Sequence, residues 1–104
     1  MAPKKIRDVI HRFKLALRKA GLPAVRMLVF GSYARGEEQN DSDIDVCLVS
    51  SQFKRNKERY RKEAVLVAYQ IDPRIQVVLA RPSDIRAGSL SPLFSSISKE
   101  SIAA

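Results

Sequence analysis

The stretch that decides the fold is VRMLVFGSYARGEEQNDSDIDVCLV, residues 25–49. It opens with an apolar run at 25–30 that ends at a glycine, which predicts a buried strand. A brief helix capped by Ser32 is expected at 32–36, and a second strand at 43–49. The connection between the two strands is short for a right-handed crossover. We therefore expect them to run antiparallel.

Helices and a third strand are predicted on both sides of this stretch. An amphipathic helix is expected at 4–20, a long helix at 54–70, a third strand at 74–80 and a last helix near 93–98. The element order is therefore α-β-α-β-α-β-α, and the long helix can serve as the crossover to a parallel third strand. This alternation predicts an α/β (α+β) fold, with a small mixed three-stranded sheet packed by helices, in a single domain over residues 1–104.

The charge of the chain, formally +8, is unevenly distributed. Basic residues gather at 4–19 and 54–63, in the two long predicted helices, whereas acidic residues gather at 37–45. Basic helix faces favour nucleic acid, other phosphates or an acidic partner, although solvated helix faces explain them equally well. An acidic cluster in a basic protein suggests bound cations.

The single cysteine, Cys47, excludes an internal disulfide and fits a reducing, cytoplasmic environment. It lies in the middle of a predicted strand, which indicates a buried, inert thiol. No apolar run approaches the roughly 20 residues of a membrane span, so no membrane association is expected. His11 lies among charged neighbours on the first helix, where a surface or interface role is expected.

Four residues around the first turn fit a nucleotide-phosphate site. Gly31 lets the backbone approach a ligand closely, and the Ser32 hydroxyl and nearby backbone N–H groups can bind an anion. Arg35, on the same short helix, can reach a phosphate or pair with a carboxylate. Tyr33 follows the turn directly and is predicted to stack on a base, whereas Tyr60 and Tyr69 are expected to pack a helix against the sheet.

Two carboxylates follow at the start of the second strand. Asp43 and Asp45 are two residues apart, so both point to one face, while Ile44, Val46 and Leu48 fill the other. Paired carboxylates are ligands that Mg²⁺ (or Mn²⁺) prefers, in combination with phosphate oxygens. Two metals about 4 Å apart can activate an attacking oxygen and stabilise a leaving one.

The spacing of these residues resembles the signature of the polymerase-beta-like nucleotidyltransferase superfamily, a Gly-Ser pair, ten residues and an Asp-x-Asp. Here the signature reads Gly31-Ser32 and Asp43-Ile44-Asp45, with ten residues between Ser32 and Asp43. The chain looks like the minimal nucleotidyltransferase (MNT) branch. The resemblance implies ATP as substrate, a divalent metal, catalytic Asp43 and Asp45, and transfer of AMP to a protein or other hydroxyl acceptor. It also implies a protein partner of the HEPN helical type, with this chain as the MntA-type antitoxin of a toxin–antitoxin pair.

One position departs from that signature. The family places a third carboxylate on the next strand, where this chain has Gln76. A glutamine oxygen can ligate a metal but brings no charge and cannot act as a general base. Asp72 lies before the strand, and Asp84 is read as a helix cap. The alternative function is therefore a catalytically weakened module that binds a nucleotide or a partner. The partner is either another protein or a second copy of the chain.

Overall fold

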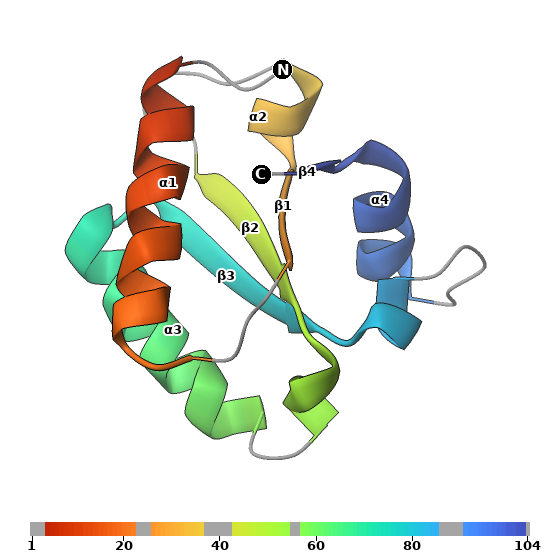
Figure 1. Ribbon diagram of the computed structural model, residues 1–104. Helices are drawn as coiled ribbons and strands as arrows, with labels where there is room; N and C mark the ends of the chain where they lie inside the picture. The colour runs from red at the N-terminus through yellow and green to blue at the C-terminus, as the bar shows by residue number, and fades with distance from the viewer. Residues whose placement is uncertain (1–3, 23–25, 37–42, 55–56, 86–90, 104) are drawn as a thin grey trace.

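The computed structural model describes residues 4–22, 26–36, 43–54, 57–85 and 91–103. These residues form a sheet with helices on both of its faces (Figure 1). The α-helices are α1 (Lys4–Lys19), α2 (Ser32–Arg35), α3 (Lys57–Ile71) and α4 (Pro92–Glu100). The strands are β1 (Arg26–Phe30), β2 (Ile44–Val49), β3 (Ile75–Ala80) and β4 (Ile102–Ala103), and two 3-10 turns are η1 (Ser51–Lys54) and η2 (Pro82–Ile85).

The sheet is mixed, with strand order β3-β2-β1-β4. β1 pairs with β2 antiparallel and β2 pairs with β3 parallel, as the lengths of the connections predict. The prediction of three strands is wrong by one, because β4 pairs antiparallel with β1 after the last helix. That strand has only two residues, which is too short to show any alternation of apolar and polar side chains.

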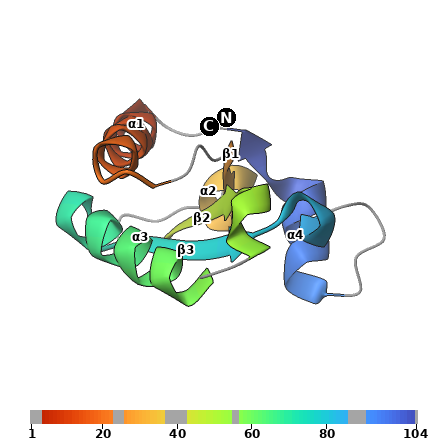
Figure 2. The same ribbon diagram turned by 60° about the horizontal axis from the view of Figure 1, so that its bottom comes forward.

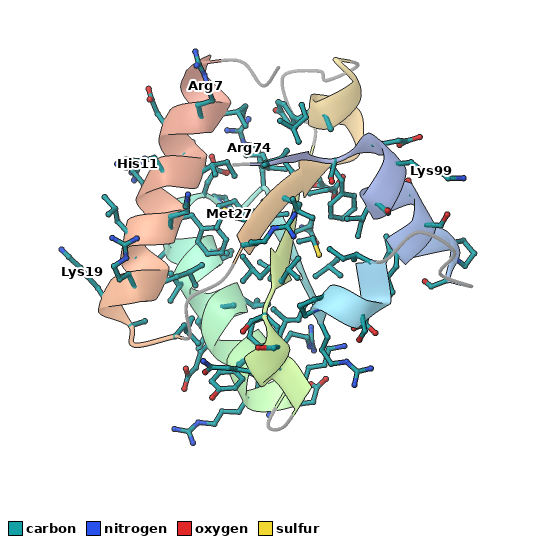
Figure 3. All side chains as sticks on the ribbon, turned by 45° about the vertical axis from the view of Figure 1, so that its right-hand side comes forward. Arg7, His11, Lys19, Met27, Arg74 and Lys99 are labelled. Atoms are coloured by element: carbon teal, nitrogen blue, oxygen red, sulfur yellow. The ribbon has the colours of Figure 1, made fainter. Side chains whose placement is uncertain are left out.

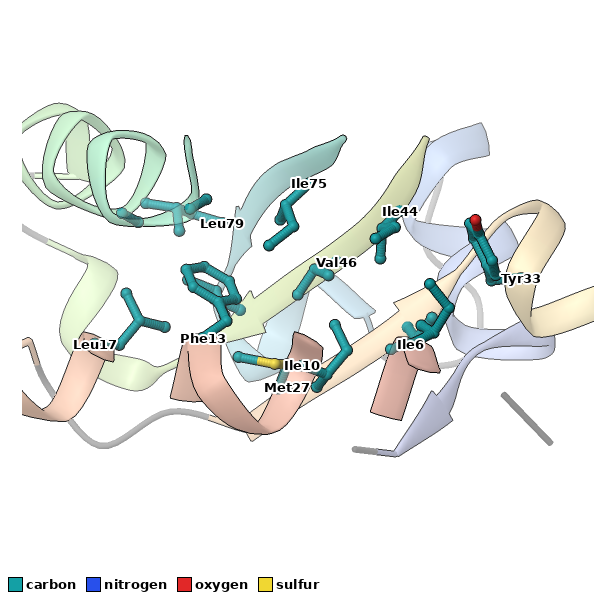
Figure 4. Packing of buried hydrophobic residues seen from close by; sticks show 14 of the residues in the cluster. Ile6, Ile10, Phe13, Leu17, Met27, Tyr33, Ile44, Val46, Ile75 and Leu79 are labelled. Atoms are coloured by element: carbon teal, nitrogen blue, oxygen red, sulfur yellow. The ribbon is translucent and has the colours of Figure 1, made fainter. Parts of the chain in front are cut away.

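Two long helices cover one face of the sheet, here called the α1/α3 face. The apolar residues of α1 recur at three- and four-residue spacing, so they form one stripe that packs on the strands (Figure 4). Sheet and helix residues meet there in one buried cluster, which includes Ile6, Ile10, Phe13, Leu17, Met27, Val29, Ile44, Val46, Leu48, Ala64, Ala68, Ile75 and Leu79. The predicted inward orientation of Ile44, Val46 and Leu48 is confirmed.

The opposite face, here called the α4 face, carries a smaller core. Side chains of β1, β2 and β3 pack there against Ile97 of α4, and the buried members are Leu28, Phe30, Cys47, Val49, Ala80 and Ile97. Figure 2 shows α1 and α3 at one side of the molecule and α4 at the other. The alternation of strand residues assigns Asp45 to the α4 face, because it lies two residues before Cys47.

Several predicted boundaries shift locally. The helix expected from residue 54 begins at Lys57, because residues 51–54 form the separate turn η1. Asp84 lies inside η2 rather than before it, and its Oδ2 accepts the backbone N–H of Arg81 at 2.8 Å. The Asp84 carboxylate thus reaches back to the N–H of the residue that precedes η2 and caps the turn. This is the contact that the acidic residue makes in a capping box. None of the helices in the described ranges is long and apolar enough to cross a membrane.

Candidate active site

The site forms where β1 ends and β2 and β3 begin. Gly31 turns the chain from β1 into α2 with a positive φ of 73°. The Asp45 carboxylate occupies the space beside its Cα, because a Cβ at position 31 would lie 3.1 Å from Asp45 Cγ and would overlap Oδ2. The turn therefore needs glycine for its backbone conformation and for the position of the carboxylate. The structure therefore brings this turn and the Asp45 carboxylate together.

Asp45 is half-buried between the neighbouring strands. Its register partner on β1 is Phe30, which is buried, and its partner on β3 is Gln76, which is exposed. Register partners in neighbouring strands place their side chains on the same face of the sheet. Gln76 therefore stands beside Asp45 at the position where the sequence signature leads one to expect a third carboxylate.

Asp43 lies at the outer end of this arrangement. It is exposed and directly precedes β2. The sheet ladder already begins beside it, because the backbone N–H of Ile44 donates to the carbonyl of Arg74 at 2.9 Å. Alternation in this extended segment favours the same side for Asp43 as for Asp45, which keeps the paired-carboxylate prediction.

The phosphate-binding residues are placed only in part. The short helix begins at Ser32, as predicted. The side chains of Ser32 and Arg35 lie outside what the structure describes, as does the acidic segment 37–42. Their roles as phosphate ligands stay predictions.

Tyr33 corrects one prediction. Its side chain is only 3% exposed and packs in the core of the α1/α3 face, near Ile6 and Ile44 (Figure 4). A buried ring cannot stack on a nucleotide base, so the predicted stacking role is wrong in this arrangement. The side chain instead fixes α2 on the sheet, because residue 33 lies on the inner side of that short helix.

Arg74, which the sequence reading passed over, connects several elements at this end of the sheet. Its Nη2 lies 2.8 Å from Asp72 Oδ2, and its Nε and backbone N–H both donate to Asp72 Oδ1. Its Nη1 also donates to the hydroxyl oxygen of Tyr33 at 3.5 Å, which directs the guanidinium toward α2 (Figure 3). The hydrogen bond from the Arg74 side chain holds the pKa of Asp72 below its usual value. An acid followed two residues later by arginine at a strand entry is the signal that could have revealed this pair.

Asp72 lies before β3, not at the strand position that Gln76 occupies, and its carboxylate is paired with Arg74. Both of its oxygens accept hydrogen bonds from Arg74, whose guanidinium also contacts Tyr33 of the α1/α3 face. In the described residues no group of three or more His, Cys, Asp and Glu side chains is placed to hold a metal ion. The donors at the site are two carboxylates and the amide oxygen of Gln76, a set of hard oxygen ligands that fits one Mg²⁺ together with phosphate oxygens.

Four other side chains bear on expectations from the sequence. Cys47 is fully buried, and desolvation raises the pKa of its thiol to about 12, as expected of an inert cysteine. His11 is exposed on α1 (Figure 3). Tyr60 is half-buried with its ring 5.7 Å from that of Phe53, whereas Tyr69 is 70% exposed, so its predicted packing against the sheet is wrong.

A family model described as a nucleotidyltransferase domain matches residues 10–101, which include every residue of this site. The chain belongs to this nucleotidyltransferase family. The match runs from the middle of α1 to the end of α4, so it covers the whole described sheet except β4.

Two known proteins resemble this nucleotidyltransferase-family chain over nearly its whole length. A protein of Methanocaldococcus jannaschii named "Putative protein adenylyltransferase MJ1305" is 28% identical over an alignment of 102 residues that covers 93% of this chain and 69% of the relative. A crystal structure described as "a putative nucleotidyltransferase from Sulfolobus solfataricus" superposes with a TM-score of 0.54 at 18% identity. The superposition covers 99% of this chain and 87% of the other, and it shows that the two share a fold.

Proposed function

We propose that this protein transfers a nucleoside monophosphate, AMP from ATP, to a hydroxyl group on a protein or another acceptor. The observation that carries the proposal is the Asp45 carboxylate held against the Gly31 turn. Membership of the nucleotidyltransferase family supports the reaction class. The name of the M. jannaschii relative supports adenylyl transfer to protein.

The proposed reaction is a displacement at the α-phosphorus of ATP. The acceptor oxygen forms a new bond to that phosphorus, the bond to the bridging oxygen breaks, and pyrophosphate leaves. Asp43 and Asp45 would hold a divalent cation, and the backbone at the start of α2 would bind phosphate oxygens. A bound Mg²⁺ would neutralise the charge of the phosphates. The proton of the acceptor hydroxyl needs a base, which the amide of Gln76 cannot provide.

Gln76 therefore favours a second candidate function, a weakened module that binds nucleotide or partner without efficient transfer. The acceptor or partner that we propose first is a helical protein of the HEPN type, with this chain as its antitoxin. In that arrangement the partner supplies the contacts to the acceptor hydroxyl, and an additional carboxylate if transfer requires one.

The test is a transfer assay with ATP labelled at the α-phosphate, MgCl₂ and the protein encoded beside this one as acceptor. Label in the acceptor, with release of pyrophosphate, is expected from the wild type and not from Asp45→Asn. Asp8→Asn is the matched control, because Asp8 is exposed on α1, on the other face of the sheet. Magnesium-dependent ATP binding without pyrophosphate release would identify the binding module instead. Transfer that survives Asp45→Asn would contradict the proposed site.

A further inference from the structure

The long helix α3 is apolar on two opposite faces. On its inner side Ala64 and Ala68 are buried against the sheet and α1. On its outer side Val65, Leu66 and Tyr69 are 41%, 65% and 70% exposed. A helix that faces water on its outer side normally carries polar residues there, so an apolar outer face indicates contact with another molecule.

Basic side chains border these exposed apolar ones. Arg61 and Lys62 line a shallow hollow of about 270 Å³ together with Val65 and Leu66. Arg61 also forms an exposed ion pair with Glu58, at 3.4 Å, which solvent screens strongly. Over residues 57–63 the basic side chains outnumber the acidic ones, so the hollow lies in a positive part of the surface. We call Arg61, Lys62, Val65, Leu66 and Tyr69 the outer α3 surface.

We propose that the outer α3 surface docks a partner protein that presents an apolar ridge flanked by carboxylates. The ridge would cover Val65, Leu66 and Tyr69, and the carboxylates would face Arg61 and Lys62. Burial of the apolar side chains supplies affinity, and the charges favour encounter with an acidic molecule.

Other occupants fit the surface less well. A second copy of the chain also carries a formal charge of +8, so the two copies repel each other at long range. Nucleic acid would leave the exposed valine and leucine without an apolar partner, although it would satisfy the basic residues. An acidic protein with an apolar ridge matches both features of the surface.

The docking surface is separate from the candidate active site. α3 packs on the α1/α3 face, and its outer surface points away from the sheet. Asp45 and Gln76 lie on the α4 face. A partner bound to α3 would therefore leave the nucleotide site open, and the inference does not depend on nucleotidyl transfer.

The test uses a synthetic amphipathic helical peptide with a leucine ridge flanked by glutamates, labelled for fluorescence anisotropy. The comparison peptide keeps the leucine ridge but has lysines at the flanking positions. The wild type is expected to bind the glutamate peptide at least about tenfold more tightly than the lysine peptide. Leu66→Gln and Lys62→Glu are each expected to weaken binding of the glutamate peptide by about tenfold.

Leu15→Gln is the matched control, because Leu15 is an exposed leucine, 43% accessible, on α1. It should leave binding unchanged. Leu15, Lys62 and Leu66 are all exposed, so the three variants should fold, and far-UV circular dichroism checks this. Equal binding of the two peptides, or equal loss in Leu15→Gln, would overturn the proposal. Sedimentation showing a wild-type dimer that Leu66→Gln dissociates would also overturn it in favour of a second copy.

Discussion

The carboxylate of Asp45 lies against the Cα of Gly31, in the space that a side chain at position 31 would occupy. The contact joins the turn after β1 to the start of β2, the two parts of the sequence signature. Gly31 is therefore part of the site, because the absence of a side chain at position 31 sets where the carboxylate can lie. Substitution of this glycine should therefore affect function as well as stability.

Gly31→Ala is expected to lower the free energy of unfolding by roughly 1–2 kcal/mol, because its φ of 73° strains any residue with a Cβ. It should also displace Asp45 and abolish the enhancement of ATP binding by Mg²⁺. Gly21→Ala separates the two effects, because Gly21 has a φ of 76° but nothing within 4 Å of its would-be Cβ. Urea denaturation should show a stability loss in both variants, at least as large in Gly31→Ala as in Gly21→Ala. Titration calorimetry should show a loss of metal response only in Gly31→Ala. An unchanged metal response in Gly31→Ala would show that the position of Asp45 is not critical.

The paired carboxylates predict a second result. Asp43→Asn combined with Asp45→Asn should abolish the increase in ATP affinity that Mg²⁺ or Mn²⁺ produces, because the cation bridges the carboxylates to phosphate oxygens. Calorimetric titration of ATP with and without metal measures this. The neutral variants should retain whatever affinity the nucleotide has without metal. A metal response equal to that of the wild type would place the metal elsewhere.

Much of the fold follows from the sequence because its strongest patterns are local. The spacing of Ile6, Ile10, Phe13 and Leu17 predicts one buried helix face, and that face packs on the sheet. The antiparallel first pair follows from the length of its connection, and the parallel third strand follows from the helical crossover. Both are consequences of chain geometry, which a sequence reports directly.

The sequence predictions that proved wrong all depend on tertiary contacts. Tyr33 is next to the turn in sequence, but its ring packs in the core of the α1/α3 face, and only the three-dimensional position of α2 decides this. Tyr69 is exposed because it falls on the outer side of α3, where apolar residues follow one another in sequence and periodicity cannot tell the two sides apart. β4 depends on pairing with β1, which no pattern within two residues can reveal.

Cys47 supplies a third prediction. The thiol is fully buried and its pKa is raised to about 12, so at pH 8 the reactive thiolate is scarce and inaccessible. A soluble disulfide reagent should therefore label the native protein only as fast as it unfolds. Labelling should become rapid in denaturing urea, which serves as the control. Rapid labelling of the native protein without urea would contradict the burial of this thiol.

A fourth prediction concerns the Asp72–Arg74 pair and pH. The pKa of Asp72 is lowered in the folded state. The stabilisation that its carboxylate gives the fold is therefore fully present above the unfolded pKa of about 4, and it disappears as pH falls through the folded pKa. Asp72→Asn should cost about 1 kcal/mol at pH 7, and the difference from wild type should shrink below about pH 4. Urea denaturation at several pH values measures this.

Glu58→Gln is the control for the pH series, because Glu58 and its ion-pair partner Arg61 are both exposed to solvent, which screens the pair. It should change stability little at any pH. The metal response of Asp72→Asn should equal that of the wild type, since Asp72 is engaged with Arg74. A lost metal response in Asp72→Asn would mean that this carboxylate takes part in the nucleotide site after all.

The last prediction concerns Gln76, which stands beside Asp45 on the adjacent strand. Gln76→Glu adds a carboxylate where the third acid of the signature is expected, and the amide and the acid have nearly the same shape. A new negative charge near the other two should raise Mg²⁺ affinity by at least about tenfold, even after screening at an exposed position. If transfer by the wild type is slow because a base and a second cation site are missing, the same substitution should accelerate it.

Gln70→Glu is the matched control, because it makes the same substitution at an exposed position on α3, on the other side of the sheet. It changes the net charge equally, so any general electrostatic attraction of Mg²⁺ should appear in both variants. A metal affinity and a transfer rate that rise only in Gln76→Glu would show that position 76 limits the site. Rapid transfer by the wild type that Gln76→Glu leaves unchanged would show that two carboxylates are sufficient, and the weakened-module alternative would then be wrong.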